Sequence, residues 1–101
     1  MGKEKFLKFS DGKPRHSLIP AEVLTELAKV LTMGAEKYGA NNWKRCRDTN
    51  LYIDALERHL QAHRSGEKVD TESGYLHLSH VLCNAAFLVY LELQKDKNAT
   101  K

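Results

Sequence analysis

Four histidines occur in two pairs at helical spacing in the second half of the chain. His59 and His63 are four residues apart, and His77 and His80 are three residues apart. Side chains at these spacings project from the same side of a helix. Imidazole is both a common metal ligand and a proton acceptor near neutral pH. The two pairs therefore indicate a site for chemistry, provided that the helices carrying them are neighbours.

A carboxylate and an amide accompany these histidines. Asp54 precedes His59 by about a turn and a half, and Asn84 follows His80 by about one turn. Imidazole and carboxylate together suit a divalent transition metal. No spacing here matches a known metal fingerprint such as HExxH, so a hydrogen-bonded histidine network in a core or interface is the alternative. The predicted metal ligands are Asp54, His59, His63, His77 and His80.

A short basic segment near the N-terminus is a candidate phosphate-binding element. Lys13 and Arg15 flank Pro14, and alternate residues of an extended chain point the same way. Lysine supplies a mobile point charge and arginine a bidentate fork. An ordinary solvated basic loop is the alternative. Arg58, next to His59, is a third candidate cation.

Aromatic rings and amides occur together after the first predicted helix. Tyr38, Asn42 and Trp43 combine a stacking surface with hydrogen-bonding groups, which is what recognition of a nucleobase requires. The alternative is that Trp43 closes the core beside a helix C-terminus. The predicted substrate-binding residues are Lys13, Arg15, Lys37, Tyr38, Asn42, Trp43, Arg58 and Asn84.

The apolar periodicity predicts three helices and no strand. The first helix spans about residues 21 to 38, between a proline and a glycine. The second is capped by Thr49 or Asn50 and ends at about residue 66. The third is capped by Asp70 or Thr71 and ends at about residue 94. The predicted inward face of the second helix is Tyr52, Ile53, Leu56, His59, Leu60 and His63.

Length and composition predict one domain that spans residues 1–101. Residues 1–19 form an irregular basic arm, and residues 95–101 form a frayed tail. The third helix is apolar nearly all round between residues 85 and 91, and two other helices cannot cover such a surface. We therefore predict an all-α, three-helix bundle that assembles into a homo-oligomer, a dimer or a tetramer.

Several classes of protein are disfavoured by the composition. A net charge of +3 is too small to mark a dedicated nucleic-acid binder. No apolar run reaches membrane-spanning length, and residues 1–9 lack the apolar core of a signal peptide. Cys46 and Cys83 are too few for a disulfide scaffold, and Cys83 is predicted to be a buried thiol. We expect a cytoplasmic protein with no membrane partner and no specific nucleic-acid partner.

Four segments together resemble a known family. They are "GKPRHSLIP", "GAEKYGANNW", "DALERHLQAH" and "DTESGYLHLSHVLCNAAFL", within residues 11 to 92. In this order they resemble the phage-encoded dATP/dGTP diphosphohydrolase N-terminal domain family, which is similar to the all-α MazG-type nucleotide pyrophosphatases. The resemblance implies a helical, oligomeric phage protein in the cytoplasm of an infected bacterium. Its implied reaction cuts purine nucleoside triphosphates between the α- and β-phosphates, which releases pyrophosphate and a monophosphate.

The chain departs from the MazG-type pattern in its carboxylates. MazG-type enzymes hold magnesium with an ExxE pair and an ExxD pair, whereas this chain has Glu22 and Glu26 four residues apart, and histidines in the third helix. Either imidazoles and Asp54 hold the metal (Mg or Mn, or else Zn, Fe or Ni), or the domain binds nucleotide without cleaving it. The second option would make it a phage protein that sequesters a host-defence signalling nucleotide. The predicted catalytic residues are Asp54, His59, His77 and His80.

Overall fold

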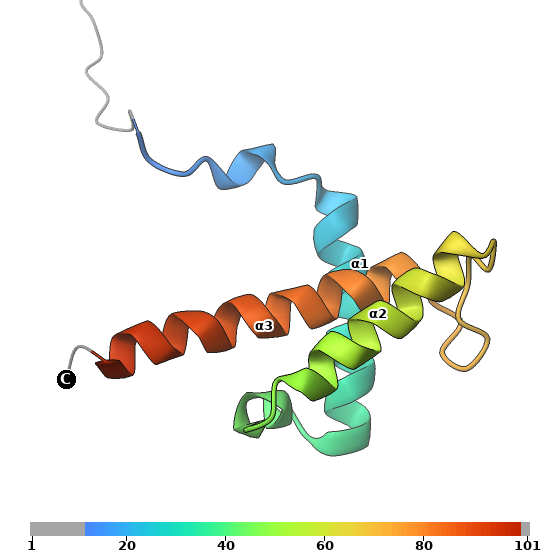
Figure 1. Ribbon diagram of the computed structural model, residues 1–101. Coiled ribbons are helices and arrows are strands. Elements are labelled where there is room, and N and C mark those ends of the chain that lie inside the picture. Colours follow the sequence, from blue (N-terminus) through green and yellow to red (C-terminus); the bar gives the residue numbers. More distant parts are fainter. Residues whose placement is uncertain (1–11, 100–101) are drawn as a thin grey trace, which may run out of the picture.

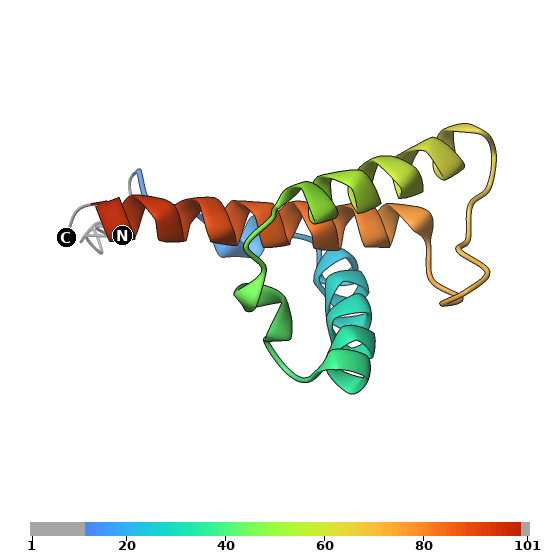
Figure 2. The ribbon, with the colours of Figure 1, turned by 60° about the horizontal axis from the view of Figure 1, so that its bottom comes forward.

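A computed structural model describes residues 12–99. It contains three α-helices and two short 3₁₀ helices: η1 (His16–Leu18), α1 (Ala21–Tyr38), η2 (Asn42–Arg45), α2 (Asn50–Arg64) and α3 (His77–Ala99). Figures 1 and 2 show α2 lying along the first half of α3, while α1 crosses α3 at a steep angle. The predicted all-α, three-helix fold is confirmed. The described residues contain no named strand, and Val69 and Leu76 form an isolated antiparallel bridge.

The first two helices have nearly the predicted bounds. Pro20 precedes α1 in an extended conformation, and Gly39 ends it with φ 95°, in the left-handed region that favours glycine. Thr49, one of the two predicted caps, is the N-cap residue of α2, but its side chain makes no capping hydrogen bond. Instead Asp48 Oδ1 accepts a hydrogen bond of 3.1 Å from the N–H of Asn50. The carboxylate one residue earlier thus satisfies a backbone donor at the start of α2.

The predicted end of the third helix at about residue 94 was wrong, since α3 continues to Ala99 through part of the predicted frayed tail. The predicted start was also wrong, since α3 begins at His77. The preceding residues form a hydrogen-bonded loop instead. The Asp70 N–H donates to Tyr75 O at 2.8 Å, and the His77 N–H donates to Lys68 O at 3.0 Å. Gly74 has φ 82°, which a helix cannot accommodate. A tight loop, rather than the first turns of a helix, therefore leads the chain into the histidine region.

A small aromatic cluster joins η2 to the helix pair. Trp43 stacks on Phe87 with ring centroids 4.4 Å apart, and the Tyr52 hydroxyl donates to Trp43 O at 2.9 Å. Burial raises the pKa of Tyr52 to about 12. Burial likewise raises the pKa of Cys83 to about 11, so Cys83 is the buried thiol that the sequence predicted. The cluster fixes the loop after α1 against α2 and α3.

Much apolar surface stays uncovered in the single chain. Val30 and Cys83 are the buried apolar residues of the described part of the chain. The predicted inward face of α2 was wrong at Ile53 and His63, which are exposed.

In Figures 1 and 2 the C-terminal half of α3 extends beyond the other two α-helices. No helix among residues 12–99 combines the length and apolarity that crossing a membrane requires.

Candidate functional site

Three of the four predicted histidines meet where α2 packs on α3. His59 Nδ1 lies 2.9 Å from His77 Nδ1. The ring of His59 also lies almost parallel to that of His80, with centroids 4.3 Å apart and an interplanar angle of 9°. His77 and His80 are buried. The antiparallel packing of α2 on α3 thus brings histidines from both helices together. We call His59, His77 and His80 the imidazole cluster.

Glu67 orients one side of this cluster. Its Oε1 lies 2.6 Å from His77 Nε2, and a carboxylate can only accept in this pair. His77 therefore carries a proton on Nε2. When His77 is neutral, its Nδ1 is an acceptor, so the proton shared with His59 belongs to His59 Nδ1. The Glu67 carboxylate therefore sets the direction of both hydrogen bonds of His77, the one to Glu67 and the one to His59.

Asp70 and Ser73 hold the other side of the cluster. Ser73 Oγ lies 2.8 Å from Asp70 Oδ2 and 2.7 Å from His80 Nε2. Asp70 Oδ2 itself is 3.4 Å from His80 Nε2. The N–H of Tyr75 donates to Ser73 Oγ at 3.2 Å. The two carboxylates that contact the histidines, Glu67 and Asp70, therefore both belong to the loop between α2 and α3.

The environment favours a neutral His59 and a neutral His80 beside a charged Asp70. Burial lowers the pKa of His59, and the neighbouring His80 lowers it further. Burial also lowers the pKa of His80, although Asp70 opposes that shift. For Asp70, burial acts to raise the pKa, but hydrogen bonds from the Ser73 hydroxyl and the Glu72 N–H outweigh it and leave the pKa lowered. At neutral pH the stacked histidines can accept protons.

This arrangement does not fit a resident metal ion held by the predicted ligands. His77 uses both ring nitrogens in contacts with other side chains, and His80 uses Nε2. His63 is exposed and Asp54 is exposed elsewhere on α2. Across residues 12–99, no group of three or more His, Cys, Asp and Glu side chains is placed to hold a metal ion.

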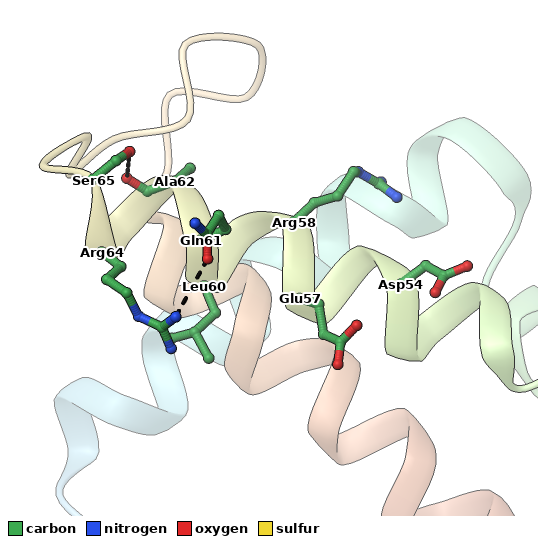
Figure 3. Close-up of a pocket in the computed structure, with 8 residues that line it drawn as sticks. All are labelled: Asp54, Glu57, Arg58, Leu60, Gln61, Ala62, Arg64 and Ser65. Atoms are coloured by element: carbon green, nitrogen blue, oxygen red, sulfur yellow. Dashed lines mark hydrogen bonds between the residues drawn. The ribbon is translucent and has the colours of Figure 1, made fainter.

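Asp54 and Arg58 belong to a different surface. They line an open hollow of about 930 Å³ along α2, together with Glu57, Gln61 and Arg64 among others. Figure 3 shows the side chains of Glu57 and Arg58 pointing in different directions. Every lining residue lies between positions 54 and 65, so α2 and its C-cap residue Ser65 supply the whole wall. The structure thus separates Asp54 and Arg58 from the imidazole cluster with which the sequence grouped them.

A second cavity brings together most of the predicted base-binding residues. It has a volume of about 670 Å³ and is lined by residues of α1, η2, α2 and α3. Its wall includes Tyr38, Asn42, Trp43 and Asn84, as well as His80 of the imidazole cluster. We call it the aromatic cavity. Its volume is in the range of small-molecule sites.

Other residues of the aromatic cavity were missed in the sequence. Tyr52, Phe87 and Tyr90 add three further rings to its wall, and Lys44 adds a cation. The Lys44 Nζ lies 4.8 Å from the centroid of the Tyr90 ring. Its position next to Trp43 was the available signal for Lys44. The three rings carried no such signal, because each reads equally well as a core residue of its helix.

Asn84 lines the aromatic cavity, whereas the predicted cations Lys37, Lys13 and Arg15 lie outside its wall. Asn84 Nδ2 donates to His80 O at 2.9 Å, which leaves Oδ1 as an acceptor. Lys37 is exposed, with Nζ 5.5 Å from the centroid of the Tyr38 ring. Lys13 and Arg15 are exposed on the N-terminal arm and do not line the aromatic cavity. Among residues 12–99, Lys44 is the cation of the cavity wall.

Comparison with known proteins identifies the family. A family model described as "dATP/dGTP diphosphohydrolase, N-terminal" matches residues 3–101. The chain belongs to this family. A relative named dATP/dGTP diphosphohydrolase, from Salmonella phage PMBT28, is 34% identical over 85 residues. These residues make up 84% of this chain but 29% of the relative, so the chain spans less than a third of that protein. No solved structure gives a significant match.

The resemblance seen in the four sequence segments is thereby confirmed. In this member of the diphosphohydrolase family two of the four segments form the region around the aromatic cavity and the imidazole cluster. "GAEKYGANNW" supplies most of the α1 and η2 wall of the aromatic cavity, and "DTESGYLHLSH" supplies the loop that anchors the histidines. The segment "GKPRHSLIP" lies on the arm, and α1 separates it from that wall along the chain.

Proposed function

We propose that this family member is a diphosphohydrolase of purine deoxynucleoside triphosphates. Water attacks the α-phosphorus, and the products are pyrophosphate and a deoxynucleoside monophosphate. The supporting observation is that His80 lies in the wall of the aromatic cavity. One site then offers a stacking surface for a base and an imidazole for proton transfer. The name of the Salmonella phage relative supports the same reaction.

The cavity residues divide naturally between base and phosphates. Tyr38 and Trp43 offer ring faces for the purine, and Asn42 and the free Oδ1 of Asn84 offer hydrogen-bonding groups for its edge or the sugar. Lys44 lies in the same wall and offers a positive charge to the phosphates. We assign Lys37 an auxiliary role at the rim beside Tyr38, where it is exposed.

We propose that the divalent cation arrives with the substrate. Nucleoside triphosphates carry Mg²⁺ or Mn²⁺ on their own phosphate oxygens, and such an ion needs few protein ligands. This role agrees with an imidazole cluster whose nitrogens are largely occupied by contacts within the chain.

We also propose that the functional form is a homo-oligomer in the cytoplasm of an infected bacterium. Leu51, Val89 and Leu93 are exposed by 61%, 59% and 55%. A second copy of the chain would cover such apolar side chains. It could also receive the exposed Lys13–Arg15 arm, which does not line the aromatic cavity of its own chain.

The decisive experiment is incubation of the purified protein with dGTP or dATP and Mg²⁺ or Mn²⁺, followed by chromatography. Monophosphate and pyrophosphate in equal amounts are expected. His77→Ala and His80→Ala should abolish turnover while circular dichroism shows unchanged helix content, and His63→Ala, outside the cluster, should retain it. Intact nucleotide that co-elutes with the protein would instead establish sequestration and refute the hydrolase.

A further inference from the structure

The hydrogen bonds around His80 specify which of its ring nitrogens carries the proton. Ser73 Oγ has a single proton to donate and lies near both Asp70 Oδ2 and His80 Nε2, at 2.8 and 2.7 Å. An ionised carboxylate can only accept, so the Ser73 proton points to Asp70. His80 Nε2 must then donate to Ser73 Oγ. A neutral His80 therefore carries its proton on Nε2.

The other ring nitrogen of His80 is consequently an unprotonated acceptor. His80 Nδ1 has no hydrogen-bond partner among the described residues. Every buried side-chain nitrogen and oxygen in the described part of the chain does have a partner, so Nδ1 must be accessible to solvent. His80 also lines the aromatic cavity. A basic, accessible nitrogen therefore belongs to a residue of the proposed nucleotide site.

We propose that Asp70 and Ser73 are positioning residues that hold His80 as the general base of the hydrolase, with Nδ1 as the proton acceptor. This inference rests on the proposed function. As the water oxygen bonds to the α-phosphorus, one water proton passes to His80 Nδ1. The bond from the α-phosphorus to the bridging oxygen breaks, and pyrophosphate leaves with the electron pair. The imidazolium that forms is stabilised through Ser73 by the Asp70 carboxylate.

The loop geometry supports a positioning role. Asp70 is held by its own backbone, since its N–H donates to Tyr75 O at 2.8 Å and its C=O accepts from Gly74 at 2.7 Å. Its second oxygen, Oδ1, faces the N–H of Glu72 at 3.4 Å. Neither Asp70 nor Ser73 lines the aromatic cavity. Both act on His80 rather than on the nucleotide.

Asp70→Asn is a sharp test because the loop dictates how the new amide must point. The amide oxygen should take the place of Oδ1, opposite the Glu72 N–H, which leaves the NH₂ group facing Ser73. Ser73 Oγ would then accept from the amide and donate to His80 Nε2. His80 would then carry its proton on Nδ1, the nitrogen that must be unprotonated to accept a proton from water. Asp48→Asn is the matched control, because Asp48 Oδ1 also accepts a backbone N–H in a turn but lies outside the cluster.

The tautomer can be measured directly by ¹⁵N NMR of the histidine rings at a fixed pH near 7.5, with the whole 101-residue chain. In the wild type we expect the His80 proton on Nε2, and in Asp70→Asn on Nδ1. With dGTP, Asp70→Asn should lower kcat by about 100-fold, within the usual contribution of general bases, and leave KM within about twofold. Asp48→Asn should change neither the tautomer nor kcat. Ser73→Ala should keep the Nε2 proton, because Asp70 Oδ2 is already 3.4 Å away.

The outcomes separate the two claims. A wild-type spectrum with the His80 proton on Nδ1 would overturn the positioning by itself, even if a variant failed to fold. A switched tautomer with unchanged kcat would overturn the role of His80 as base. Absence of any hydrolysis by the wild type, with the Nε2 proton in place, would refute the proposed function together with the base role and confirm only the hydrogen-bond direction.

Discussion

His59 and His80 lie face to face, with ring centroids 4.3 Å apart and planes inclined by 9°. Burial is the largest cause of the lowered pKa of each histidine. If both rings were protonated, the two positive charges would also lie next to each other. A histidine whose folded-state pKa is lowered binds protons more readily when the chain unfolds. Stability is then fully present above the unfolded pKa of about 6.5 and decreases as the pH falls below it.

The melting temperature should therefore fall by a few degrees between pH 7.5 and pH 5.5. Asp70 and Glu26 do not contribute in this window, because their lowered pKa values place their titration at more acidic pH. His59→Gln should reduce the slope of melting temperature against pH, measured by thermal denaturation. His63→Gln replaces an exposed histidine of the same helix and should leave the slope unchanged. A wild-type melting temperature independent of pH in this range would contradict the stacked, buried pair.

Trp43 should serve both the fold and the nucleotide. Its ring stacks on Phe87 at 4.4 Å and meets the edge of Tyr90 at 5.1 Å. Trp43→Ala should lower the free energy of unfolding by about 3 kcal/mol, measured by urea denaturation, as for other large-to-small changes in packed sites. Trp43→Phe should lose less, because an aromatic face remains.

Nucleotide binding offers an independent readout of the same residue. Trp43 is the only tryptophan of the chain, so its fluorescence reports the aromatic cavity alone. Addition of dGTP to the wild type should quench this fluorescence, while pyrophosphate, which has no ring to stack, should not. Equal quenching by dGTP and pyrophosphate would show that the base does not reach Trp43.

The helices were predictable because their apolar periodicity and flanking residues are local signals. Pro20 and Gly39 bound α1 as expected. The start of α3 was not predictable in the same way, since Asp70 and Ser73 are common at helix N-termini and equally suited to the loop that they form. The displaced start explains His63 as well. In an antiparallel pair the last turn of α2 lies opposite residues before His77, and no helix is present there to cover an imidazole.

The site was predictable in its residue types more than in its grouping. The spacing of His77 and His80 correctly placed them on one side of a helix, but spacing along one helix carries no information about which partner lies opposite. Asp54 was therefore joined to the histidines, whereas it lies on a different surface of α2. Glu67 and Asp70, which orient the cluster, lie in the loop between α2 and α3. Helical spacing therefore could not group them with the histidines, and the path of the loop brings them into contact.

Lys44 should control affinity for the phosphates. It is the cation of the aromatic cavity wall, and charged hydrogen bonds of this kind contribute about 1.5–3 kcal/mol. Lys44→Met keeps an apolar stem over Tyr90 and removes the charge. The variant should weaken binding of dGTP about tenfold or more, by isothermal titration, and affect deoxyguanosine little. Arg45→Met removes the neighbouring charge outside the cavity and should bind like the wild type; a larger effect of Arg45→Met would assign the phosphates to another surface.

The exposed apolar residues of α3 should be covered by a second copy of the chain. Val89 and Leu93 are four residues apart, so their side chains share one face of the helix, and both are more than half exposed. Light scattering coupled to gel filtration should show an oligomer for the wild type and a monomer for Val89→Glu/Leu93→Glu, because burying two carboxylates in an apolar contact is costly. Lys95→Glu introduces a carboxylate at a solvated position of the same helix, where an exposed ion pair with Glu92 contributes little, and should remain oligomeric. A monomeric wild type at the same protein concentration would show that these side chains face water.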